Sequence, residues 1–119
     1  MLKVYHYAKC STCQGALRWL RDRGIEFTEA AIKDSPPDLD ELRAMLKAKD
    51  GNARALFNTS GLEYRAQGLK DKLSAMTDAA ALSLLAGNGM LVKRPFALDT
   101  ARGVFLVGFR EKEWADALA

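Results

Sequence analysis

Hydrophobic and polar residues alternate over residues 2–6, which predicts a short β-strand at the start of the chain. The apolar positions that follow have helical spacing until Gly24, a typical helix stop. A second alternating run extends over residues 25–32. Two strands joined through a helix favour a right-handed crossover into a parallel pair. Residues 1–33 are therefore predicted to form a βαβ unit.

The middle of the chain contains the start and stop signals of short helices rather than of strands. Pro36 and Pro37 break the chain, and Asp38 with Glu41 three residues later has the spacing of a capping box. Thr77 can cap a further helix, which residues 87–89 (Gly-Asn-Gly) would close. The segment between the prolines and these glycines is predicted to contain only helices and turns.

Two more short strands, residues 96–98 and 104–107, are predicted after the helical segment, joined by a polar loop of hairpin length. Residues 110–118 then favour a terminal helix. The order β-α-β, helical block, β-β-α predicts an α/β protein with a thioredoxin-like fold and a mixed four-stranded sheet. We expect one domain over residues 1–119, with thioredoxin-like parts 1–33 and 90–119 and a helical insertion at about 38–89.

Composition narrows the class of protein. With 119 residues and 49% hydrophobic composition, the chain can bury the core of one ordinary domain. Two cysteines and one histidine cannot supply four zinc ligands within one chain, although two chains could share a zinc through both cysteine pairs. The net charge of +3 is scattered rather than clustered, which argues against direct binding of nucleic acid. No apolar run has the roughly 18 residues of a membrane span, so a cytoplasmic protein is expected.

Both cysteines lie in the segment Cys10-Ser11-Thr12-Cys13, between the first predicted strand and helix. Free N–H groups and the helix dipole favour a thiolate there, and thiol pKa values fall to roughly 3.5–7.5 at such positions in proteins. Cys10 is the predicted nucleophile, with Lys9 as a nearby positive charge, and Cys13 the thiol that resolves the adduct. The alternative is that both cysteines are small buried hydrophobic residues.

Arg94-Pro95 precedes the third predicted strand. Thioredoxin-like folds place a cis-proline at this point, facing the active-site cysteines. A cis Pro95 would hold Arg94 beside Cys10, where its guanidinium could stabilise a thiolate or a bound oxyanion. The alternative for Arg94 is an ordinary surface arginine.

Three motifs resemble the ArsC-like family: residues 7–13 (Tyr-Ala-Lys-Cys-Ser-Thr-Cys), residues 57–65, which contain Phe-Asn-Thr-Ser-Gly, and residues 89–95 with 107–109 (Val-Gly-Phe). The family contains glutathione-dependent arsenate reductases, Spx-type transcription regulators and many small proteins of its own uncharacterised branch, which this chain resembles most. The resemblance implies a thiol-dependent oxidoreductase with no bound cofactor, reduced by glutathione, glutaredoxin or thioredoxin, and monomeric. The catalytic residues implied are Cys10, Cys13 and Arg94, and the candidate substrate-binding residues are Lys9, Ser11, Thr12, Arg65 and Pro95.

The chain departs from the arsenate reductases of this family. Two of their three arginines fall at or near Asn58 and Gly108, which carry no charge, and Arg65 could compensate only if it turned inward. These reductases also lack a cysteine at the position of Cys13. Both departures argue against efficient arsenate reduction.

Spx-type regulators are the second candidate class. They carry the Cys-x-x-Cys as a disulfide switch and bind the C-terminal domain of the RNA polymerase α subunit. Gly51 stands near their contact glycine, although a glycine at a helix end also has an ordinary structural role.

Overall fold

A mixed sheet of four strands, in the spatial order β2-β1-β3-β4, forms the centre of the computed structural model, which describes all 119 residues. The strands are β1 (Leu2–His6), β2 (Phe27–Ala31), β3 (Phe96–Asp99) and β4 (Val104–Val107). Strand β1 pairs with β2 in parallel and with β3 antiparallel, and β3 pairs antiparallel with β4. This arrangement confirms the predicted α/β class and the mixed sheet.

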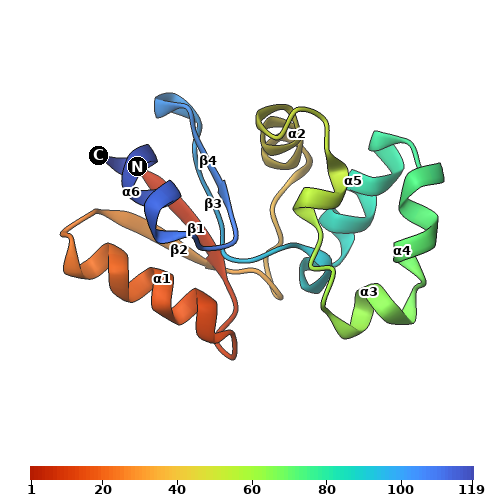
Figure 1. Cartoon of the computed structure of the whole chain (residues 1–119), viewed down its shortest axis with the longest axis horizontal. Helices are drawn as coiled ribbons and strands as arrows, with labels where there is room; N and C mark the ends of the chain where they lie inside the picture. The colour runs from red at the N-terminus through yellow and green to blue at the C-terminus, as the bar shows by residue number, and fades with distance from the viewer.

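Helices cover both faces of the sheet (Figure 1). Helices α1 (Ser11–Asp22) and α6 (Glu111–Leu118) lie on one side. The segment between β2 and β3 lies on the other side and contains four α-helices: α2 (Leu39–Ala48), α3 (Leu62–Ala66), α4 (Leu69–Lys72) and α5 (Asp78–Gly87). The helical character predicted for the middle of the chain is confirmed.

The two faces of the sheet bury separate hydrophobic cores. Neighbouring residues of a strand point to opposite faces, and Val4 accordingly belongs to one core and Tyr5 to the other. The larger core, of 17 buried residues, joins the sheet to the helical segment. The smaller core, of 9 buried residues, lies under α1 and α6 and contains Trp114. Because both faces are covered, every residue of β3 is buried.

The ends of the helices show why their boundaries fall where they do. Helix α2 begins at the predicted capping box, in which Asp38 and Glu41 exchange side-chain and backbone hydrogen bonds. At the end of α1, the N–H of Gly24 donates to the carbonyl of Arg21 and the N–H of Ile25 donates to that of Leu20, the pattern of a Schellman motif. Strand β2 therefore begins at Phe27, two residues later than the alternating run, because Ile25 still completes the helix end.

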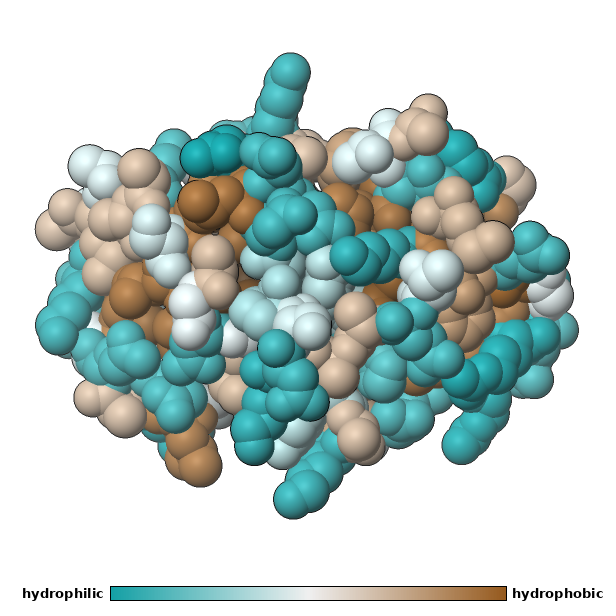
Figure 2. Space-filling view, turned by 180° about the vertical axis from the view of Figure 1, so that it is seen from behind, coloured by the Kyte–Doolittle hydropathy of each residue, from teal (hydrophilic) through white to brown (hydrophobic).

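The surface exposes few large hydrophobic side chains. Only Met1, Leu39 and Leu62 are exposed among them, and Leu62 is the most exposed at 81%. Figure 2 shows one face as a mosaic in which hydrophobic residues form separate small patches among hydrophilic ones. No helix combines the length and apolar character needed to cross a bilayer.

Gly89 joins the helical segment to the end of β2 by a close backbone contact. A Cβ on Gly89 would lie only 1.7 Å from the carbonyl oxygen of Ile32, which is completely buried. Such a contact cannot be relieved by turning a side chain, because the obstacle is backbone. Gly87, two residues earlier, has open space around its Cβ position.

We expect Gly89→Ala to lower the free energy of unfolding by about 2–3 kcal/mol, because an added methyl group forces the two segments apart. Gly87→Ala is the matched control and should leave stability unchanged or raise it by up to about 1 kcal/mol. Urea denaturation followed by circular dichroism measures both. Equal effects of the two substitutions would contradict the close approach at Gly89.

Candidate functional site

Cys10 is the residue that caps the N-terminus of α1. Its backbone is extended, and its Sγ accepts a hydrogen bond from the backbone N–H of Cys13, with 3.3 Å between nitrogen and sulfur. The N–H of Cys10 itself donates to the carbonyl of Tyr7, which closes the turn that leads from β1 into the helix. The first cysteine thus lies at the positive end of the helix dipole, where a negatively charged sulfur is stabilised.

Cys13 lies one turn into α1 and faces the core. Its side chain is completely buried, whereas that of Cys10 is half-buried, and both are free thiols. Burial, with a smaller contribution from a hydrogen bond with Cys10, raises the pKa of the Cys13 thiol to about 12, although a backbone hydrogen bond involving Tyr7 and the positive charge of Arg94 act in the opposite direction. The two sulfurs are therefore chemically unequal: Cys10 is accessible and Cys13 is covered and protonated.

Arg94 reaches the same end of the sheet through the loop before β3. The Arg94–Pro95 peptide bond is cis, as expected for a thioredoxin-like fold. The guanidinium lies 5.1 Å from the centroid of the Tyr7 ring, and one terminal nitrogen donates to the carbonyl of Met90 at 3.4 Å. The Nε–H of Arg94 is buried and has no hydrogen-bond partner within the protein.

A cavity of about 320 Å³ opens beside the Cys10 sulfur. Three of the lining residues are cations, and none carries a carboxylate. The nine lining residues are Cys10, Thr12, Asn58, Lys93, Arg94, Val107, Gly108, Phe109 and Arg110. The cavity therefore combines a thiol, a hydroxyl, an amide and three positive charges, a set suited to an anionic ligand.

The segment after β4 forms one wall of this cavity and is held from three sides. The N–H of Gly108 donates to the carbonyl of Pro95 at 2.9 Å, and the indole N–H of Trp114 donates to the carbonyl of Gly108 at 2.9 Å. The ring of Phe109 packs edge-on against that of Trp114, with 5.2 Å between centroids. Gly108 has φ +70°, a conformation that side-chain-bearing residues rarely adopt.

Not all of the candidate residues meet at the cavity. Thr12 and Arg94 line it together with Cys10. Lys9 and Ser11 flank Cys10 in the chain but are exposed and do not line the cavity, and Pro95 is buried behind Arg94. Arg65 is exposed on α3 and does not line it either, so the structure does not bring this arginine to Cys10.

Apart from Asn58 and Gly108, four lining residues were not among the candidate site residues, although three of them lie in the quoted motifs: Lys93, Val107, Phe109 and Arg110. Lys93 precedes Arg94, Val107 and Phe109 flank Gly108, and Arg110 follows Phe109. That adjacency was the signal available in the sequence. Asn58 and Gly108, where the family resemblance places arginines, do lie at the cavity without charge, but Lys93 and Arg110 restore positive charge there.

A second cavity, of about 480 Å³, shares the lining residues Asn58 and Arg94 with the first. Its far wall is formed by α3 and the preceding turn and includes the exposed Leu62. Asn58 is held between the two cavities because its N–H donates to the carbonyl of Leu91 at 2.7 Å. The two cavities are therefore neighbours on the surface.

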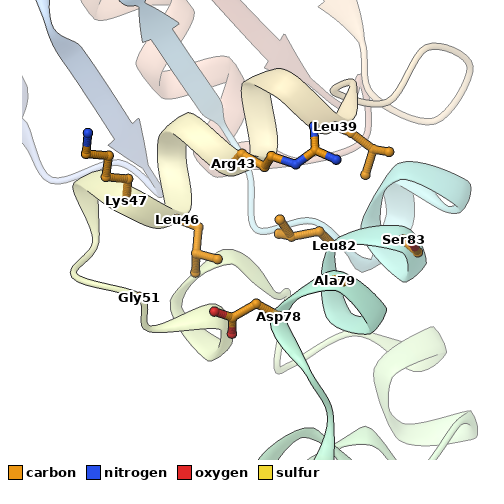
Figure 3. A pocket seen from close by; sticks show the side chains of 9 residues that line it. All are labelled: Leu39, Arg43, Leu46, Lys47, Gly51, Asp78, Ala79, Leu82 and Ser83. Carbon is orange, nitrogen blue, oxygen red and sulfur yellow. The ribbon is translucent and has the colours of Figure 1, made fainter.

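A separate groove of about 450 Å³ lies between α2 and α5 (Figure 3). Leu46 from α2 and Leu82 from α5 point toward the space between the helices, and Gly51 lies at its edge. Arg43 and Lys47 add positive charge along α2. None of its lining residues belongs to the Cys10 cavity.

The fold and the site together define the class: a thioredoxin-like protein with a helical insertion, a Cys-x-x-Cys at the start of its first helix and a cis-proline directly before its third strand. The sequence matches the ArsC family over residues 5–117, and the chain belongs to this family.

Three relatives show how the chain compares with other members of the family. The uncharacterized protein YusI of Bacillus subtilis is 40% identical over 115 residues, which are 97% of this chain and 96% of YusI. The global transcriptional regulator Spx of Enterococcus faecalis is 30% identical over 113 residues, which are 95% of this chain and 83% of the regulator. The crystal structure of an ArsC family related protein from Bacteroides fragilis is 39% identical, covers 98% of this chain and 96% of its own, and has a TM-score of 0.90.

We expect iodoacetamide at pH 8 to label Cys10 in the native protein and to leave Cys13 unlabelled, because the Cys13 thiol is buried and its pKa is raised to about 12. Peptide mass spectrometry identifies the labelled residue. Both cysteines should be labelled in concentrated urea, which serves as the control. Native labelling of both thiols at similar rates would contradict the unequal environments.

Proposed function

We propose that the protein is a thiol-disulfide oxidoreductase in which Cys10 is the nucleophile and Cys13 the resolving thiol. The observation that carries this proposal is the contrast between the two sulfurs: one caps a helix at a cationic cavity, and the other is buried one turn away. Nucleophilic attack needs an accessible thiolate, and resolution needs a second thiol within reach but protected from the solvent.

The reaction proceeds in two exchanges. The Cys10 thiolate attacks one sulfur of a substrate disulfide, forms a mixed disulfide and expels the other sulfur as a thiolate. Cys13 then loses its proton to that leaving thiolate or to water and attacks the Cys10 sulfur, which expels the second thiol. Two electrons pass from the cysteine pair to the substrate, and glutathione, glutaredoxin or thioredoxin supplies them back.

The groups around Cys13 favour attack by Cys10 first and by Cys13 second. The hydrogen bond and the charge of Cys10 both raise the pKa of Cys13, in addition to burial. Once Cys10 is in a mixed disulfide, both influences disappear, while the positive charge of Arg94 still favours the Cys13 thiolate. Attack at Cys10 therefore prepares Cys13 to react, and the resolving thiol stays protonated until there is an adduct to resolve.

A disulfide substrate suits this site better than arsenate. The arsenate reductases of the family have arginines where this chain has Asn58 and Gly108, and they have no cysteine at the position of Cys13. A resolving thiol within the same chain is useful when the adduct on Cys10 is itself a disulfide. We propose Arg94 as the residue that stabilises the Cys10 thiolate, since it shares the cavity and its buried Nε–H has no other partner.

We expect Cys13→Ser to accumulate a mixed disulfide between Cys10 and glutathione when the protein is mixed with oxidised glutathione, because the resolving step is removed. The unaltered protein should instead form the Cys10–Cys13 disulfide, and Cys10→Ser should form neither. Intact-mass spectrometry separates the three products. A stable glutathione adduct on the unaltered protein, with no internal disulfide, would contradict the assigned roles.

A redox-switched regulator is the second candidate function. Its support is the 30% identical Spx relative together with the groove between α2 and α5, which contains Gly51 and the two cations of α2. Isothermal titration of the reduced and the oxidised protein with the purified C-terminal domain of the RNA polymerase α subunit tests it. Absence of binding in both states rules this candidate out and leaves the oxidoreductase.

A further inference from the structure

The positive charge around Cys10 comes mainly from residues outside the cysteine motif. Lys93 lies across the backbone of Gly108: a Cβ placed on that glycine would be 2.9 Å from Cε of Lys93 and 3.7 Å from its Nζ. The absence of a side chain at Gly108 therefore lets the lysine ammonium lie against the cavity wall. Arg110 lines the cavity from the other end of the same short segment.

These three cations have no carboxylate partner within the protein. The structure contains eight ion pairs, and none of them involves Lys93, Arg94 or Arg110. The carboxylate nearest to Arg110 in sequence, Glu111, pairs instead with Arg23. Like charges at one concave surface repel each other and attract an anion into the space between them.

The volume of the cavity bears on the size of the anionic ligand that it can hold. The cavity measures about 320 Å³, which is at the lower end of the range for small-molecule sites. A neighbouring cavity, whose lining includes Glu63, shares Asn58 and Arg94 with it. A small organic disulfide with acidic groups therefore finds room here that a single tetrahedral oxyanion does not need.

We propose that Lys93 and Arg110 are specificity-determining residues that bind the carboxylate groups of a small acidic disulfide while Cys10 attacks its sulfur. This inference rests on the proposed function, because it assigns the substrate class of the same site. Val107 and Phe109 offer apolar surface to the carbon chain of such a molecule, and Thr12 and Asn58 offer hydrogen bonds. The first exchange releases one acidic thiolate, and attack by Cys13 releases the second.

The first test compares two alkylating reagents that differ mainly in charge. Iodoacetate carries a carboxylate and iodoacetamide is neutral, and both alkylate a cysteine thiolate. We expect Lys93→Gln and Arg110→Gln each to slow alkylation of Cys10 by iodoacetate roughly threefold to tenfold at low ionic strength, and to change the iodoacetamide rate less than twofold. Both residues are exposed, so neither substitution disturbs the core.

Lys112→Gln is the matched control. It removes the same charge from an exposed lysine on α6 that pairs with Asp116 and lies outside the cavity. It should leave both alkylation rates unchanged. If the double variant Lys93→Gln/Arg110→Gln keeps the iodoacetate-to-iodoacetamide ratio of the unaltered protein, the inference is overturned while the oxidoreductase stands. If iodoacetamide fails to alkylate Cys10 even in the unaltered protein, the proposed function itself fails.

The second test uses real disulfides. Oxidised glutathione carries carboxylates and cystamine carries ammonium groups, and the rate at which each oxidises the cysteine pair follows from thiol loss. We expect the double variant to react at least fivefold more slowly with oxidised glutathione and no more slowly with cystamine. Equal slowing with both disulfides, or no slowing with either, would overturn the assignment of an acidic disulfide.

Discussion

The hydrogen bond from the backbone N–H of Cys13 to the sulfur of Cys10 is the interaction on which the site depends. It ties the sulfur of the first cysteine to the end of the helix, so a backbone N–H holds this side-chain atom in place. The same turn of helix carries Cys13 into the core, where burial raises the pKa of its thiol. The start of one helix thus holds two sulfurs that differ in accessibility.

The order of strands explains why distant segments of the chain meet at Cys10. Strand β1 ends just before Cys10, and β3, which runs antiparallel beside it, begins just after Arg94 and Pro95. Strand β4 pairs antiparallel with β3 and ends at the segment that leads to Gly108. One edge of the sheet therefore collects the cysteine motif, the cis-proline loop and the segment after β4. The fold thus brings the cations of the last two segments close to the Cys10 sulfur, although they are far from Cys10 in the sequence.

The sequence predicted the four strands and the longer helices because each of them has its own local signal. The capping box at Asp38 and the Thr77 cap are both present in the structure. The cis bond before Pro95, which was expected from the thioredoxin-like fold, is present as well. Local sequence signals did not predict which cations line the cavity, because tertiary contacts determine that. Lys93 reaches the cavity only because Gly108, fifteen residues later, leaves room for it, and Arg65 remains on the surface of α3 although its sequence position suggested a role. Neither the contact between Lys93 and Gly108 nor the surface position of Arg65 can be predicted from local sequence patterns alone.

The central claim is that Cys10 and Cys13 form a reversible disulfide within the intact fold. Equilibration of the protein in glutathione buffers of increasing oxidation, followed by acid quenching and peptide mass spectrometry, measures it most directly. The account predicts one two-electron transition from the dithiol to a Cys10–Cys13 disulfide, with far-ultraviolet circular dichroism unchanged across it. Oxidation that yields only disulfides between chains, or that unfolds the protein, would contradict the account.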